Sequence, residues 1–120
     1  MITVIDESVI LRYILNDDKR HAKEAAELIA GGQVYSYPEI FARVAVVLRD
    51  IYRVPRSLIS ETLLMLLDDI CVCEEDIVRY ASRLFGSSML DYVDCLLVAR
   101  NVLHNNKVLT YDKPLLKNML

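Results

Sequence analysis

Apolar and polar positions alternate along the chain in blocks that predict short buried strands separated by amphipathic helices. The first apolar run, residues 2–6, is short and continuous, as expected for a strand buried on both faces, and it ends in Asp6. Further strands are predicted over Val34–Tyr37, Ile70–Cys73 and Lys107–Asp112. Apolar spacing, caps and breaking residues predict helices over residues 8–15, 20–30, 38–53, 57–69, 74–84, 91–103 and 114–119.

The order of these elements predicts the fold class. Strands that alternate with helices form a mostly parallel sheet with right-handed crossovers and helices on both faces. We therefore predict an α/β fold, a three-layer α/β/α sandwich with a four- to five-stranded sheet. The 120 residues fit one domain spanning positions 1–120, and a hydrophobic share of 54% is typical of a well-packed core.

Charge and cysteine content narrow the function classes. A net charge of −3 argues against a general nucleic-acid binder, but bound divalent cations can supply positive charge in an enzyme that cuts RNA. Arg49, Arg53 and Arg56 are bunched around a predicted helix end, where a solvated terminus is the favoured interpretation. The three cysteines, which have no CxxC spacing, predict reduced, buried thiols: Cys71, Cys73 and Cys95.

No apolar stretch reaches the roughly 18 residues that a membrane span needs, and no basic leader precedes a long apolar segment. We therefore expect a cytoplasmic protein without a membrane partner. His21 and His104 lie apart and show no metal-ligand spacing, so both are predicted to be surface residues.

Three aspartates are the candidate site. Asp6 and Asp112 each end a predicted strand, and Asp94 lies near the start of a predicted helix between them. Strand C-termini and helix N-termini share one edge of a parallel sheet, so these carboxylates are expected to converge. Such a cluster suits a hard divalent cation.

Four segments, taken in order and spacing, resemble the PIN-domain family, which includes the VapC-type toxins of bacterial toxin–antitoxin pairs. The resemblance extends from about Thr3 to Leu116. The segments that carry it are Val4–Tyr13 (VIDESVILRY), Pro38–Val44 (PEIFARV), Leu90–Ala99 (LDYVDCLLVA) and Val108–Asp112 (VLTYD).

The resemblance implies a Mg²⁺- or Mn²⁺-dependent ribonuclease with Asp6, Asp94 and Asp112 as catalytic metal ligands. In that chemistry the metal orients and deprotonates an attacking water and offsets charge on the scissile phosphate. The partners it implies are RNA, a small antitoxin protein and a second copy of the chain in a homodimer.

The chain departs from the family pattern at two places. Arg43 stands where the family usually has an acidic residue, and Glu7-Ser8 replaces the usual Thr-Asn after the first aspartate. Three arrangements stay open for Arg43, which is a permanent cation. It pairs with Asp6 or Asp94 and replaces the metal, or it turns outward while Glu39 or Glu7 supplies the missing carboxylate, or it contacts the RNA phosphate.

Supporting residues each have a catalytic and a structural interpretation. Ser8 either orients Asp6 or caps a helix, and Thr110 either bonds a site aspartate or satisfies a strand. Asp91 is favoured as a helix cap over a residue that positions metal-bound water. Asp112 can cap the turn before Pro114. Asp94, inside an apolar helix, can form a salt bridge to an arginine such as Arg43.

Two functional classes therefore remain: a metal-dependent RNA-cleaving enzyme, and a non-catalytic PIN-like module that binds RNA or a protein. The helices between residues 38 and 69 carry aliphatic residues that form either a dimer interface or part of the core: Val46, Val47, Ile51, Leu63, Leu64 and Leu67.

Overall fold

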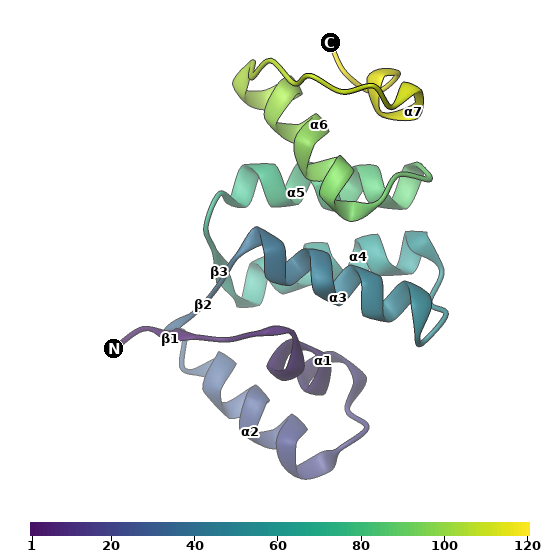
Figure 1. The fold of residues 1–120 in the computed structure, drawn as a ribbon. Coiled ribbons are helices and arrows are strands. Elements are labelled where there is room, and N and C mark those ends of the chain that lie inside the picture. The colour runs from purple at the N-terminus through teal and green to yellow at the C-terminus, as the bar shows by residue number, and fades with distance from the viewer.

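The computed structural model describes residues 1–120 and consists of seven helices and three short strands (Figure 1). The strands are β1 (Thr3–Val4), β2 (Val34–Ser36) and β3 (Cys71–Val72). The helices are α1 (Glu7–Leu15), α2 (Lys19–Ala30), α3 (Pro38–Asp50), α4 (Arg56–Asp69), α5 (Glu75–Ser87), α6 (Tyr92–His104) and α7 (Lys113–Leu116).

The sheet is parallel throughout, with strand order β1-β2-β3. Thr3 is paired with Val34, and Tyr35 is paired with Cys71. The α/β class and the parallel pairing agree with the sequence prediction. Each crossover between neighbouring strands contains two helices, which is why the helical content far exceeds the strand content.

The predicted strand over residues 107–112 is not formed, so the sheet has three strands rather than four to five. Residues 107–111 form no backbone–backbone hydrogen bonds. Leu109 and Tyr111 are 84% and 92% exposed. The physical reason lies in the preceding helix, because α6 carries this segment to the end of the molecule opposite β1 (Figure 1).

Local sequence signals account for most helix boundaries. Asp6, rather than the predicted Ser8, is the N-cap of α1, and its carboxylate accepts from the backbone N–H groups of Ser8 and Val9. Pro38 occupies the first turn of α3, where its missing N–H costs nothing. Asn105 ends α6 in the left-handed conformation, with φ of 57°.

Helix α5 continues past Leu84 through Gly86, where the sequence predicted its end. A Cβ atom built on Gly86 would lie 2.6 Å from Cβ of Ser60 on α4. Gly86 therefore permits a close approach of the two helices, and this packing keeps the residue helical despite its low propensity.

One continuous apolar core joins the sheet to helices α1–α6. Leu63 and Leu67 belong to this core, whereas Val46 and Ile51 are 41% and 68% exposed. The aliphatic residues proposed for a dimer interface are thus partly core residues. An amphipathic helix buries one stripe of its surface against the core and exposes the opposite face.

The expectation of three buried thiols is wrong for two of them. Cys95 is buried, and Cys71 and Cys73 are exposed. The two exposed cysteines flank Val72 on the edge strand β3, where alternate side chains point to opposite faces. None of the helices has both the length and the apolar character needed to cross a bilayer.

Helices α1 and α2 lie at the end of the molecule that carries β1, and α6 and α7 lie towards the opposite end (Figure 1). The molecule is elongated, with principal extents of 45 × 32 × 18 Å. The residues that follow β1 and those that follow α6 are therefore far apart, which bears directly on the predicted aspartate cluster.

Candidate functional site

Asp6 lies between β1 and α1, and its carboxylate is engaged by the start of that helix. Oδ1 of Asp6 accepts a 2.6 Å hydrogen bond from the Ser8 hydroxyl and a 3.0 Å bond from the Ser8 N–H. The hydroxyl bond is the main reason that the pKa of Asp6 is lowered. Ser8 therefore orients Asp6, which is one of the two roles predicted for it.

Asp94 lies in the first turn of α6 and has no hydrogen-bond or salt-bridge partner in the chain. Burial is the first cause of its raised pKa, followed by the negative charges of Asp91 and Asp112. Those two aspartates are thus its electrostatic neighbours. The predicted ion pair between Asp94 and Arg43 is not formed.

Asp112 is the N-cap of α7, and its Oδ1 accepts a 3.4 Å bond from the N–H of Leu115. Its own backbone N–H donates to Oγ1 of Thr110 at 3.1 Å. Asp112 therefore has the capping role that was one of its two predicted interpretations. Thr110 bonds the backbone of this aspartate, not a strand.

The three predicted metal ligands do not form one cluster. No group of three or more His, Cys, Asp or Glu side chains lies close enough to hold a metal ion. The charge of Asp112 contributes to the raised pKa of Asp94, whereas the pKa of Asp6 is lowered by Ser8 and by backbone donors. The missing fourth strand explains this, because Asp112 would reach the β1 edge only if residues 107–111 paired with that edge.

Arg43 projects from α3 and pairs with Glu7, with Nη1 3.2 Å from Oε1. The side chain of Arg43 is 69% exposed, and that of Glu7 is 25% exposed. The second carboxylate oxygen of Glu7 is buried and has no hydrogen-bond partner. Arg43 therefore offsets the charge of Glu7, one of the two residues predicted to supply the missing carboxylate. The other, Glu39, is exposed.

A groove of about 920 Å³ lies between α3 and α6. Glu7 and Arg43 line it together with a second ion pair, in which Nη2 of Arg100 is 3.0 Å from Oε1 of Glu74. Glu39 lines it as well. Its apolar surface is formed by Ala42, Val46, Val47, Val93 and Leu96. Opposite charges and an apolar surface make this groove a candidate binding surface.

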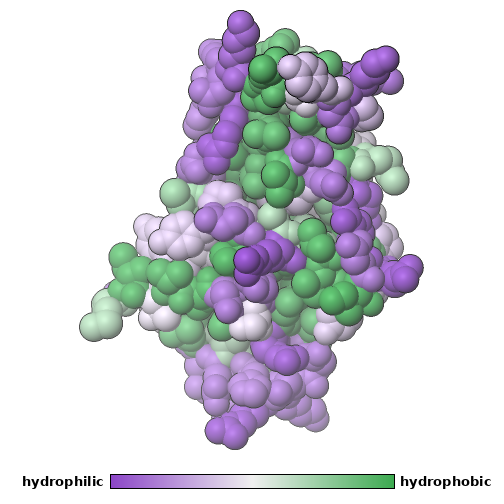
Figure 2. Space-filling model, viewed as in Figure 1, coloured by the Kyte–Doolittle hydropathy of each residue, from purple (hydrophilic) through white to green (hydrophobic).

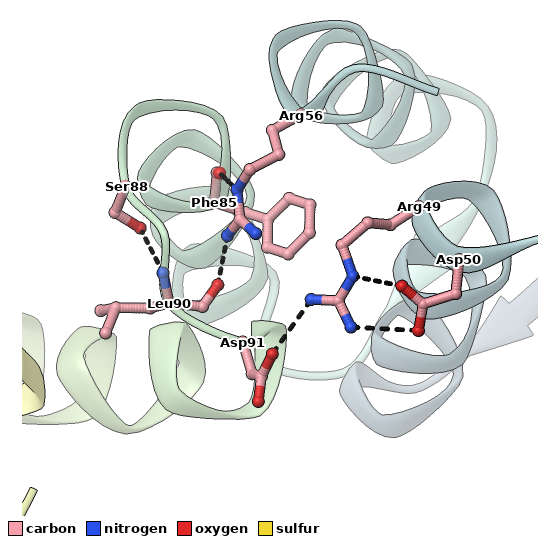
Figure 3. Close-up of polar contacts among 7 residues, drawn as sticks. All are labelled: Arg49, Asp50, Arg56, Phe85, Ser88, Leu90 and Asp91. Atoms are coloured by element: carbon pink, nitrogen blue, oxygen red, sulfur yellow. Dashed lines mark hydrogen bonds and ion pairs between the residues drawn. The ribbon is translucent and has the colours of Figure 1, made fainter. Parts of the chain in front are cut away.

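Arg49 and Arg56 bind the residues at the start of α6 (Figure 3). The sequence had favoured a solvated helix end for these arginines. Nη1 of Arg49 bonds Oδ1 of Asp91 at 3.0 Å, and Asp50 receives two further bonds from the same guanidinium. The hydrogen bonding that Arg49 donates to Asp50 is the main cause of the raised pKa of Arg49. Asp91 is at the N-cap position of α6, but its side chain forms no capping bond and pairs with Arg49 instead.

Arg56 is half-buried and joins α4 to the turn before α6 (Figure 3). Its Nε donates to the carbonyl of Phe85 at 2.9 Å, and its Nη2 donates to the carbonyl of Leu90. Its guanidinium carbon lies 3.8 Å from the centre of the Phe85 ring. The only sequence signal for this role was the bunching of arginines around Pro55.

Comparison with known protein families identifies the family of this chain. The profile of the PIN domain family matches residues 3–118, nearly the whole chain. The chain belongs to the PIN domain family. Among curated proteins and among solved structures, no match was found. The chain is thus a nuclease-like PIN domain, and its family membership agrees with the resemblance carried by the four sequence segments.

PIN domains commonly bind divalent metal ions. A Mg²⁺ ion is usually held by one or two carboxylates together with water and substrate phosphate. The predicted set of Asp6, Asp94 and Asp112 does not fit as placed, because the three side chains are not gathered and Asp6 is occupied by its own helix. Asp94 has no partner and lies near two other acids, so it comes nearest to what a metal ligand requires.

Proposed function

We propose that this PIN domain acts on RNA and that its metal-dependent cleavage is weakened because Arg43 replaces an acidic ligand. The observation that carries the proposal is the Arg43–Glu7 ion pair at that position. A guanidinium there offsets negative charge that would otherwise attract a divalent cation. A positive charge at this position would oppose the binding of a divalent cation, and the ion pair with Glu7 and the 69% exposure of the Arg43 side chain reduce this effect without reversing it.

The structure narrows the three arrangements that the sequence left open for Arg43. The arginine pairs with an acid, as in the first arrangement, but the acid is Glu7 and not Asp6 or Asp94. Glu39, one turn earlier on α3 and exposed in the same groove, is the remaining candidate for a compensating carboxylate. Its presence supports weakened cleavage more than complete loss.

The test is Mn²⁺-dependent cleavage of a structured RNA by wild type, Arg43→Glu and Arg43→Glu/Asp94→Asn. We expect Arg43→Glu to cut at least about tenfold faster than wild type, a gain equivalent to about 1.4 kcal/mol in the barrier. Adding Asp94→Asn should abolish that gain. Glu61→Gln, which changes an exposed acid in the middle of α4, is the matched control and should leave the rate unchanged.

Equal rates for wild type and Arg43→Glu would contradict the proposal. They would favour the second candidate, a fully active metal-dependent ribonuclease in which Arg43 is tolerated. One observation favours this alternative: Asp94 is an unpartnered carboxylate with a raised pKa beside Asp91 and Asp112. If no variant cleaves RNA but all of them still bind it, the protein is instead a non-catalytic RNA-binding module.

We further propose that the protein belongs to a toxin–antitoxin pair, with a small antitoxin protein as its partner. The support is the family and the amphipathic groove between α3 and α6. A small reading frame directly upstream, whose product co-purifies with this chain and relieves growth arrest, is the expected finding. A solitary gene whose expression leaves growth unaffected would contradict this role.

A further inference from the structure

Residues 107–111 form an extended segment whose hydrogen-bonding capacity is unused. None of their backbone groups takes part in a backbone–backbone hydrogen bond. Exposure alternates along the segment: Val108 and Thr110 are half-buried against the molecule, while Leu109 and Tyr111 point outward. An apolar, β-branched and aromatic sequence with free backbone groups is ready to join a sheet.

The sheet presents a matching free edge at β1. The N–H groups of Thr3 and Ile5 donate to the carbonyls of Gln33, which precedes β2, and of Tyr35, which lies within it. The backbone groups of the alternating residues Ile2 and Val4 therefore face the opposite, unpaired edge. Ile2 and Val4 are 61% and 57% exposed, and no strand of the chain pairs with this edge of β1.

An exposed apolar edge without charge is a liability that proteins usually remove. They do so with charged side chains, proline, a bulge or a covering element. Residues 1–5 contain no charged side chain and no proline. Figure 2 shows hydrophobic residues exposed at the level of the N-terminus, where β1 lies in Figure 1.

The two features lie at opposite ends of an elongated molecule. β1 lies beside α1 and α2, whereas the 107–111 segment crosses the far end of α6 (Figure 1). The segment is held there from both sides. The side chain of Asn101 bonds the Asn106 carbonyl at 3.0 Å, and Leu115 of α7 is 2% exposed. In this arrangement the segment of one copy cannot reach the β1 edge of the same copy.

We propose that two copies associate side by side in opposite orientations, so that residues 107–111 of each copy add to the β1 edge of the other. Because the features lie at opposite ends, a single two-fold axis satisfies both pairings at once and closes the assembly. Main-chain hydrogen bonds supply the attraction, as in other cases of strand addition. Lys107 is the only charged residue in either strand, so no like charges oppose one another.

This pairing gives each sheet a fourth strand that is supplied by the second copy. It would also carry Asp112, which follows the added strand, to the sheet edge at which Asp6 follows β1, provided that the added strand runs parallel to β1. The association itself does not depend on cleavage activity, so it can fail or hold independently of the proposed function.

The first test mixes two variants in a Cys71→Ser/Cys73→Ser background, one with Thr3→Cys and one with Leu109→Cys. Thr3 is the middle residue of the stretch 1–5, and Leu109 is the middle residue of the segment 107–111. Pairing of these two stretches therefore places the two positions opposite one another in either strand direction. We expect a disulfide-linked dimer that contains one chain of each variant, seen on a non-reducing gel and by mass spectrometry. Mixing Glu61→Cys with Leu109→Cys is the matched control and should give no such species.

A chain that carries both Thr3→Cys and Leu109→Cys distinguishes pairing between two copies from pairing of residues 107–111 with β1 of the same copy. An intrachain disulfide in this chain, with no linked species from the mixture, would show that the segment folds onto its own β1 and would overturn the proposal. Absence of both disulfides would overturn it as well.

The second test measures molar mass by light scattering. We expect wild type to approach twice the monomer mass of 13.8 kDa with increasing concentration. Leu109→Pro removes a main-chain donor that forms no bond within the chain, so it should leave the monomer folded but unable to pair. Leu109→Ala keeps that donor and should still associate. A wild type that stays monomeric, or a Leu109→Pro variant that still associates, would contradict the pairing.

Discussion

Asp94 differs from the other predicted site residues in having no partner. Asp6 and Asp112 each accept hydrogen bonds at a helix start, and the bonds to Asp6 lower the pKa of its carboxyl. Asp94 gains no such bond, and its pKa is raised by burial and then by the charges of Asp91 and Asp112. Its ionisation therefore costs stability in the folded state.

We expect Asp94→Asn to increase the free energy of unfolding at pH 7. The folded pKa lies above the unfolded value, so the wild type loses stability as the pH rises through the folded pKa. The amide avoids this loss. The gain should be only about 0.5 kcal/mol, because water screens a partly exposed carboxylate.

Urea unfolding of wild type and Asp94→Asn at pH 7 and pH 3 checks this expectation. The difference should disappear at pH 3, below the unfolded pKa, where the aspartate is protonated in both states. Glu61→Gln serves as the control at both pH values. A stability loss at pH 7 would indicate that the Asp94 carboxylate has a favourable partner.

At the scale of elements, the start of α6 is positioned by residues from two other helices. Arg49 at the end of α3 bonds Asp91, and Arg56 at the start of α4 bonds the carbonyls that precede it (Figure 3). A helix N-terminus that carries the candidate residue Asp94 is thus fixed by cations from distant segments. Local capping contributes nothing there, because Asp91 makes no side-chain cap.

The contact between α4 and α5 gives a sharper prediction at this scale. Gly86→Ala should lower the free energy of unfolding by about 1–2 kcal/mol, because the new Cβ would meet Cβ of Ser60 at 2.6 Å. Overpacking of this kind outweighs the gain of up to about 1 kcal/mol in helix propensity.

Chemical unfolding of the two single variants and the double variant forms a mutant cycle. Ser60→Gly removes the opposing Cβ, so Gly86→Ala should cost less in that background than in wild type. An equal cost in both backgrounds would show that the clash with Ser60 is not the cause.

At the scale of the whole molecule, the elongated shape separates the parts of the predicted site. The end with β1 carries Asp6, and the end with α6 and α7 carries Asp112 (Figure 1). Helices α3 and α6 border the groove between these ends, and Arg43 and Glu7 line it. A single copy therefore presents a charged groove and an unfinished sheet.

If two copies complete each other's sheets, thermal stability should depend on concentration. The unfolding midpoint of wild type should rise as the protein concentration is increased a hundredfold, because association stabilises the folded state by mass action. The midpoint of Leu109→Pro should stay constant. Scanning calorimetry measures both, and a concentration-independent midpoint for wild type would contradict association.

Much of the fold was predictable because its signals are local. Apolar runs marked the first three strands, and Pro38 and Asn105 marked helix ends through backbone preference alone. The N-cap of α1 was predicted at Ser8 and lies at Asp6. The end of α5 was misjudged, since Gly86 is a breaking residue unless a neighbouring helix needs its small size. Tertiary packing there overrides local propensity.

The candidate site was predictable only as a set of residue types. The sequence by itself determined the family motifs, a cationic side chain at Arg43 and the presence of acids after two apolar runs and at a helix start. Only the tertiary structure decided that Arg43 pairs with Glu7, that Arg49 and Arg56 hold the start of α6, and that residues 107–111 stay outside the sheet. The physical reason is distance along the chain: helix caps and apolar periodicity act over a few residues, whereas ion pairs and strand pairing depend on how segments tens of residues apart are packed.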